Sequence, residues 1–120
     1  MKQSVYGFET ALQLFTSGDY EEVLGIAMPH AIAGNSNAQC MISLLYQNGF
    51  GVTKDLAEAG RWPLLAAKQD NAVAWNNLGI LYAIGGAGLS RGPDVANECY
   101  QRAKQLGFDC ARPYPPGAAS

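Results

Sequence analysis

The chain has 120 residues, of which 48% are hydrophobic and 15% are charged, and its formal net charge is -2. This length suits one domain with its own core, and the small negative charge excludes the strongly basic surface that binding to nucleic acid requires. Because the sequence contains neither a run of 18 apolar residues nor a signal-peptide pattern, we expect a cytoplasmic protein that does not span or bind a membrane.

A first predicted unit covers about residues 1–34. Phe15, Gly18 and Asp19 indicate the end of one helix and a short turn, with Asp19 as the N-cap of a helix that begins at Tyr20. Pro29 lies inside that second helix. Since a proline there removes an interior hydrogen bond, we expect a kink or an early break.

A second unit covers about residues 35–70. Apolar residues with helical spacing predict an amphipathic helix over about residues 37–48, which ends at a glycine-rich turn. These residues are Ala38, Ile42, Leu45 and Tyr46. Asp55 is placed to cap a second helix over about residues 55–69, and Pro63 is expected to kink or break it.

The strongest feature of the sequence is a third unit, about residues 71–107, that repeats the second one. Its helices are predicted over about residues 71–84 and 93–107, with Pro93 at a tolerated first-turn position. Asn35, Ala38, Ile42, Leu44, Leu45, Tyr46 and Gly49 recur 36 residues later as Asn71, Ala74, Leu78, Ile80, Leu81, Tyr82 and Gly85.

The fold class follows from this repetition of helix pairs. One pair cannot bury its apolar face alone, whereas stacked pairs share a continuous core. We therefore predict an all-α protein, a short right-handed α-solenoid of about three antiparallel helix pairs, in a single domain over residues 1–110. Residues 111–120 are rich in proline and small residues, and we expect them to be a disordered tail.

The segment LLYQNGFGVTKDLAEAGRWPLLAAKQDNA, followed by AWNNLGILYAIGGAGL, resembles the Sel-one-like repeat (SLR) family. These tetratricopeptide-like solenoids have the signature Leu-Gly-x-x-Tyr-x-x-Gly-x-Gly-Val-x-x-Asp, and the resemblance covers residues 35–107. Ser43 replaces the signature glycine, and Pro63 interrupts a helix that should continue. The resemblance implies that a partner binds the concave face through the first helix of each pair. The matching positions here are Glu9, Gln13, Cys40, Leu44, Gln47, Asn76, Asn77 and Ile80.

Residues suited to catalysis are scarce. His30 is the only histidine, which excludes a site with several histidine ligands and leaves little room for a catalytic triad. Cys40, Cys99 and Cys110 lack metal-ligand spacing, so we expect reduced, structural thiols. We predict no enzymatic activity, no metal and no cofactor.

The leading hypothesis is a protein–protein interaction module, an adaptor or chaperone-like protein. Its amide side chains would bond the backbone of an extended protein or peptide partner on the concave face. Three alternatives remain open: an immunity protein that neutralises a cognate bacterial toxin, a cell-wall-associated accessory protein or hydrolase, and a homodimer formed through exposed ends of the solenoid.

Overall fold

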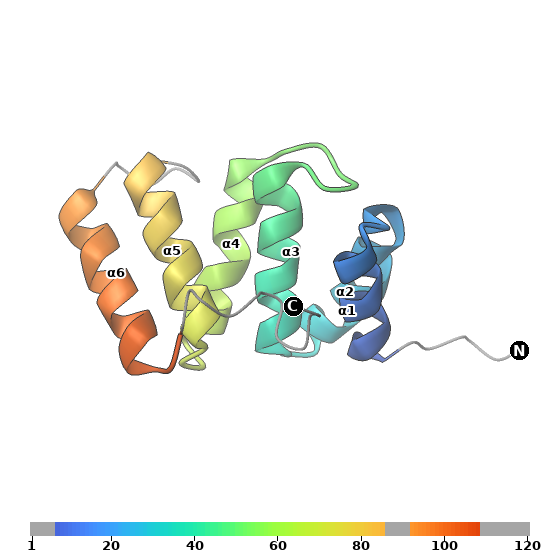
Figure 1. The fold of residues 1–120 in the computed structure, drawn as a ribbon, viewed down its shortest axis with the longest axis horizontal. Coiled ribbons are helices and arrows are strands. Elements are labelled where there is room, and N and C mark those ends of the chain that lie inside the picture. The colour runs from blue at the N-terminus through green and yellow to red at the C-terminus, as the bar shows by residue number, and fades with distance from the viewer. Residues whose placement is uncertain (1–6, 86–91, 109–120) are drawn as a thin grey trace, which may run out of the picture.

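The computed structural model describes residues 7–85 and 92–108, and within them the protein is entirely helical. Figure 1 shows the helices stacked along the long axis of the molecule, from α1 and α2 at one end to α6 at the other. The predicted all-α solenoid is therefore confirmed. The elements are α1 (Phe8–Ser17), the 3₁₀ helix η1 (Tyr20–Glu22), α2 (Val23–Ile32), α3 (Ser36–Asn48), α4 (Leu56–Ala67), α5 (Ala72–Ile84) and α6 (Pro93–Gln105).

Asparagine side chains start the first helices of the second and third pairs. The Asn35 Oδ1 atom accepts a hydrogen bond of 2.9 Å from the Ala38 N–H, and the Asn71 Oδ1 atom accepts one of 3.1 Å from the Ala74 N–H. Asp55 caps α4 through its carboxylate, as predicted. Each bond satisfies a backbone donor that a helix start leaves unpaired, so the sequence itself sets these boundaries.

Asp19 does not cap the second helix of the first pair, contrary to the prediction. Its side chain makes no capping bond and instead accepts a hydrogen bond of 3.0 Å from the Ser17 hydroxyl. The chain passes through η1 before α2 begins at Val23. The short turn after Gly18 therefore leads into a tight 3₁₀ turn, and the backbone at Asp19 lacks the extended conformation that N-caps adopt.

The core consists of two buried clusters that meet at α3. One cluster joins α1, α2 and α3 with Trp62 of α4, and the other joins α3, α4, α5 and α6. Because α3 contributes Met41 and Ile42 to the first cluster and Cys40 to the second, it packs on both sides. Both clusters therefore extend across the boundary between neighbouring pairs, as a solenoid requires.

Both prolines lie inside helices that continue past them. Of the two predicted outcomes, the early break does not occur, and the kink stays a prediction. α2 continues to Ile32 and α4 to Ala67. Pro63 has no N–H to bond the carbonyl of Ala59, four residues earlier. The buried Ser43 hydroxyl donates a hydrogen bond of 2.6 Å to that same carbonyl. Two departures from the repeat signature, a serine and a proline, thus compensate for each other.

The turn of the second unit packs against the first pair. The Phe50 ring stacks on the Tyr20 ring at 4.5 Å between centroids, and Phe15 meets both rings edge-on. Gly51 follows with a φ of 74°, and a Cβ atom there would lie 2.6 Å from the Tyr20 carbonyl oxygen. Only glycine fits this close approach, so the signature glycine here serves a contact between units.

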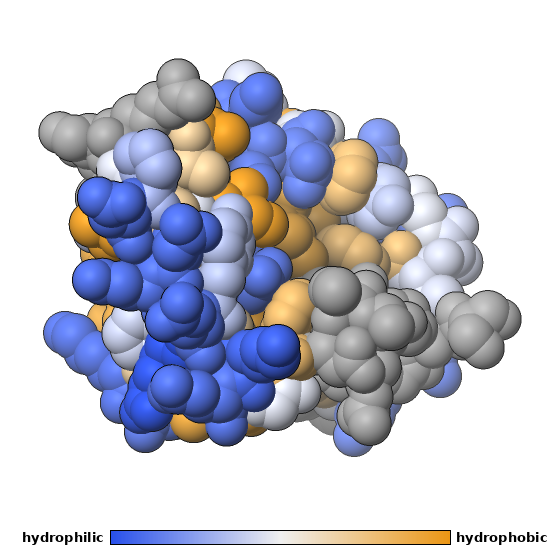
Figure 2. All heavy atoms as spheres, turned by 60° about the vertical axis from the view of Figure 1, so that its left-hand side comes forward, coloured by the Kyte–Doolittle hydropathy of each residue, from blue (hydrophilic) through white to orange (hydrophobic). Residues whose placement is uncertain are grey.

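The end of the stack formed by α6 has a polar outer surface. α6 buries only Ala96, Cys99 and Ala103, and Figure 2 shows hydrophilic side chains over its outer face, beside an apolar strip that leads inward. The homodimer through exposed solenoid ends stays a prediction. At this end its interface would be formed by polar side chains.

Candidate functional site

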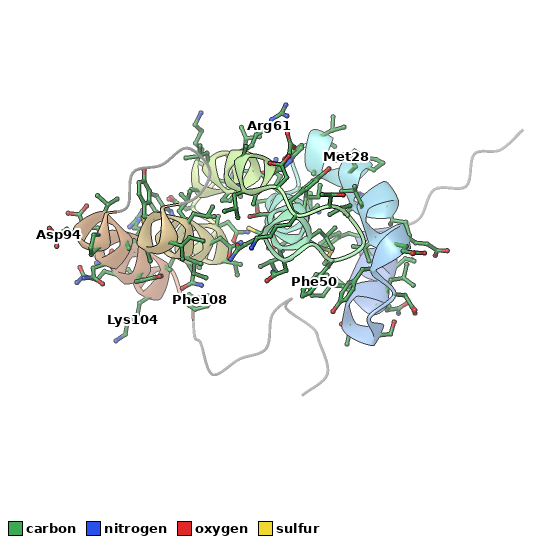
Figure 3. The ribbon with its side chains drawn as sticks, turned by 90° about the horizontal axis from the view of Figure 1, so that it is seen from above. Met28, Phe50, Arg61, Asp94, Lys104 and Phe108 are labelled. Atoms are coloured by element: carbon green, nitrogen blue, oxygen red, sulfur yellow. The ribbon has the colours of Figure 1, made fainter. Side chains whose placement is uncertain are left out.

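The second helices of the first two pairs, α2 and α4, lie toward one side of the stack. In the view from above, Met28 on α2 and Arg61 on α4 mark one side, whereas Phe50 and Phe108 mark the opposite side (Figure 3). We call the exposed sides of α1, α3 and α5 the first-helix face. The partner-binding residues predicted from the sequence all belong to these three helices.

Most of the predicted binding residues keep exposed surface. Glu9 and Gln13 are exposed on α1, and four of the six predicted residues on α3 and α5 are partly exposed. Those with accessible side chains are Glu9, Gln13, Leu44, Gln47, Asn76 and Ile80. They are neutral apart from Glu9, so the first-helix face offers hydrogen bonds and apolar contacts rather than a strong electric field. Their role in binding stays a prediction.

Cys40 and Asn77 do not lie on an accessible face, because their side chains are 0% and 3% exposed. Cys40 packs in the second core cluster, and its thiol donates a hydrogen bond of 3.5 Å to the Asn71 Oδ1 atom. Burial raises the pKa of Cys40 to about 12, so this thiol stays protonated and unreactive. Both residues support the fold rather than contact a partner directly.

Two amide atoms near this face lack hydrogen-bond partners among the described residues. They are the Gln47 Oε1 and Asn77 Nδ2 atoms, and both are buried. A buried polar atom left without a partner costs about 1–3 kcal/mol. Gln47 as a residue is partly exposed, although this oxygen is not.

Amide side chains also fix the second and third pairs relative to each other, which the sequence did not reveal. The Asn71 Nδ2 atom donates hydrogen bonds of 2.9 Å to both the Ser36 hydroxyl and the Asn37 Oδ1 atom. The Gln69 Nε2 atom donates one of 2.9 Å to the Gly34 carbonyl. These bonds hold the starts of α3 and α5 together, so the first-helix face is positioned before any partner arrives.

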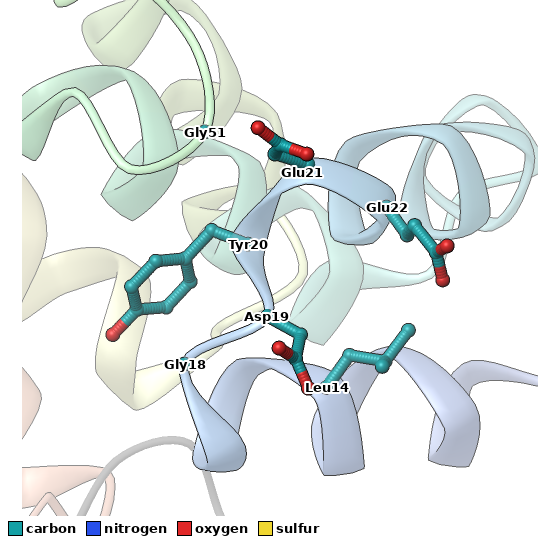
Figure 4. Close-up of a pocket in the computed structure, with 7 residues that line it drawn as sticks. All are labelled: Leu14, Gly18, Asp19, Tyr20, Glu21, Glu22 and Gly51. Carbon is teal, nitrogen blue, oxygen red and sulfur yellow. The ribbon is translucent and has the colours of Figure 1, made fainter.

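An acidic concavity of about 540 Å³ lies at the turn between α1 and α2. Asp19, Glu21 and Glu22 line it, together with Tyr20, and Figure 4 shows the three carboxylates pointing in different directions. Within residues 7–85 and 92–108 no cluster of His, Cys, Asp and Glu has an arrangement that could hold a metal ion. The concavity is therefore a negatively charged surface rather than a metal site.

A second concavity, of about 450 Å³, lies between α4 and α6 with α5 as its floor, and the sequence analysis missed it. We call it the α4–α6 groove. Leu64 and Val95 on its walls are 48% and 40% exposed. Periodicity assigned neither residue to an apolar face, so no local pattern predicted a groove here. Its lining is Leu64, Ala67, Lys68, Trp75, Leu78, Tyr82, Val95, Glu98, Cys99 and Arg102.

Two further residues with reactive side chains, His30 and Cys99, lie in the described part of the chain, whereas Cys110 and the predicted tail over residues 111–120 lie outside it. The partly buried His30 ring packs edge-on against Phe8 at 6.3 Å between centroids. Burial, with a further contribution from the Glu98 carboxylate, raises the pKa of Cys99 above its ordinary value. Among the described helices, none has the length and hydrophobicity needed to cross a bilayer.

Comparisons with known proteins agree with this architecture. The model of the Sel1 repeat matches residues 36–71 and 72–108. A Sel1 repeat protein from Oxalobacter formigenes has a crystal structure that superposes with a TM-score of 0.76 at 31% identity, over 85% of this chain and 42% of that chain. The structure of c5321, described as a protective antigen present in uropathogenic Escherichia coli strains displaying an SLR fold, superposes with a TM-score of 0.74 at 27% identity, over 84% of this chain and 22% of that one.

The chain thus spans less than half the length of either structure. No curated protein matches the sequence. Proteins built from such repeats are generally interaction modules, and the family is typically a non-catalytic scaffold.

Proposed function

The chain belongs to the Sel1 repeat family, and we propose that it is a non-catalytic module that binds a protein or peptide through its first-helix face. The observation that carries this proposal is the position of Gln47 and Asn76, two amide side chains on neighbouring first helices. Both are partly exposed, and the helices that carry them are joined through Asn71. Such a surface offers donors and acceptors at fixed positions.

The partner that suits this surface best is an extended segment of another protein. Amide groups can donate to a backbone carbonyl and accept from a backbone N–H, so they bond a peptide with little dependence on its sequence. Leu44 and Ile80 lie on the same two helices and would contact the side chains of that segment. The low charge of the face implies an affinity that depends weakly on salt.

A pull-down with mass spectrometry from the native organism tests this proposal. Gln47→Arg combined with Asn76→Arg should abolish recovery of the partner, because bulky charges would block the face. Gln101→Arg places the same change on the exposed outer side of α6 and should leave recovery unchanged. Recovery that is equal for both variants, with unchanged helical content, would rule out the first-helix face.

The finer alternatives stay predictions and differ in the identity of the partner. An adaptor or chaperone-like role requires an ordinary cellular partner, whereas an immunity role requires a toxin. Survival of cells that co-express a candidate toxin with this chain would favour immunity. Turnover of a cell-wall substrate by the purified protein would contradict the non-catalytic proposal. The cytoplasmic location is likewise a prediction from the sequence.

A further inference from the structure

The α4–α6 groove has the composition of a site for a proline-rich segment. Its floor carries the aromatic rings of Trp75 and Tyr82, and its walls carry the partly exposed side chains of Leu64 and Val95. Polyproline II segments dock in aromatic-lined grooves because their backbone is ordered in advance and loses little entropy on binding. A volume of about 450 Å³ lies within the range of ligand-binding pockets.

A segment of this kind follows α6 in the same chain. Residues 112–116 have the sequence Arg-Pro-Tyr-Pro-Pro, in which three prolines surround Tyr114. Prolines favour the extended polyproline II conformation, and the tyrosine supplies a large ring whose burial is favourable. The described part of the chain reaches Phe108, six residues before Tyr114.

The connection is long enough to reach the groove. Six extended residues span about 20 Å. The part of α6 that lines the groove, from Val95 to Arg102, is about 10 Å long at 1.5 Å per residue. The Phe108 N–H bonds the Ala103 carbonyl at 2.9 Å, so the connection begins beside the Arg102 end of the groove and can enter the groove there. Since α6 itself forms one wall, the attached segment would be present at a high effective concentration.

The charges on the rim favour this segment as well. Arg102 is already paired, because its guanidinium lies 3.2 Å from the Asp70 carboxylate. Glu98, one turn earlier on α6, is exposed and forms no ion pair within the described residues, while Lys68 lies on the rim contributed by α4. Arg112 would bring a positive charge to the Glu98 carboxylate.

We propose that residues 112–116 of the same chain dock in the α4–α6 groove, with Tyr114 filling its apolar floor and Arg112 beside Glu98. The groove is then covered by an intramolecular occupant, which other ligands of the groove would have to displace. This inference is independent of the first-helix face, because it concerns a different surface and a different ligand.

Thiol modification in the full-length chain tests the docking. Cys99 lines the groove and is 5% exposed, whereas Cys40 is 0% exposed and reports unfolding of the core. In a Cys110→Ser background, Tyr114→Ala should raise the rate at which a small aromatic disulfide modifies Cys99 by about tenfold, which corresponds to ~1.4 kcal/mol of docking free energy. Tyr114→Phe keeps the ring and should retain the protection.

Equal rates at Cys99 for the parent, Tyr114→Ala and Tyr114→Phe would overturn the proposal. So would a rate in the parent that rises on dilution, because the occupant would then come from a second copy. NMR shows where the segment docks. Tyr114→Ala should shift the indole N–H resonance of Trp75, which lines the groove, and leave that of Trp62 unchanged. A shift of neither resonance, or of both equally, would also overturn it.

Discussion

The hydrogen bond from Ser43 to Ala59 allows a stringent test of the packing between α3 and α4. Ser43→Ala removes a hydroxyl that bonds the Ala59 carbonyl at 2.6 Å in the buried interior. Pro63 cannot replace that donor because it has no N–H. The carbonyl would be left buried and unpaired, so we expect the free energy of unfolding to fall by about 1–3 kcal/mol.

Pro63→Ala changes this expectation in a defined way. An alanine at position 63 has an N–H four residues after Ala59, which a regular α-helix bonds to the Ala59 carbonyl. With that donor present, Ser43→Ala should cost less by about 1 kcal/mol or more. Pro63 is itself fully buried, so its replacement has a packing cost, but that cost is common to both Pro63→Ala proteins and cancels in the double-mutant cycle.

Urea unfolding of the four proteins, followed by circular dichroism and by tryptophan fluorescence, measures the coupling. Coincident transitions justify a two-state treatment of this small domain. Ser17→Ala is the matched control, because its hydroxyl bonds the Leu14 carbonyl at an exposed position. Its effect should be small and equal in both backgrounds. If Ser43→Ala costs the same with Pro63 as with alanine, within the ~0.5 kcal/mol expected for additive sites, the compensation is refuted.

Three further predictions concern stability. In urea unfolding, Asn71→Ala should lower the free energy of unfolding by about 1 kcal/mol more than Asn35→Ala does. Both changes remove an N-cap, but only Asn71 also bonds Ser36 and Asn37. Equal losses would contradict the role of these two bonds. Leu81→Ala empties a fully buried position and should cost about 2–5 kcal/mol, so an unchanged thermal melt would show that the helix register is wrong. The Cys40 pKa rises from 9.0 to about 12 on folding, so above pH 9 the unfolded chain loses a proton that the native state keeps. Stability should therefore decrease as pH rises from 9 to 12, by up to ~1.4 kcal/mol per pH unit, and Cys40→Ala should flatten this slope.

The elements that were predictable from sequence depend on local information. The predicted cap at Asp55 bonds backbone groups two and three residues away, and the amphipathic spacing of α3 and α5 lies within single helices. Continuation of α4 through Pro63 was not predictable, because its compensating donor lies 16 residues away on another helix. Contacts between helices of this kind leave no periodic pattern in the sequence.

The candidate binding face was predictable only in part for a related reason. Helical periodicity marks one buried side, but α3 packs against neighbours on two sides, and this second contact buries Cys40. Asn77 of α5 is buried as well, although the family resemblance implied a position on the binding face. The α4–α6 groove depends on the spacing of two helices that are far apart in sequence, so Leu64 and Val95 gave no sign of it.

The stack of Phe50 on Tyr20 means that the units of this solenoid are not interchangeable modules. The second unit carries Phe50 and Gly51 to fit the first pair, whereas the third unit has glycine at position 86, which matches Phe50. An array made by copying the second unit would place Phe50 against Leu56, the residue that matches Tyr20, and the ring stack would be lost. The contacts between the turn of one unit and the preceding pair therefore require the units to follow one another in this order.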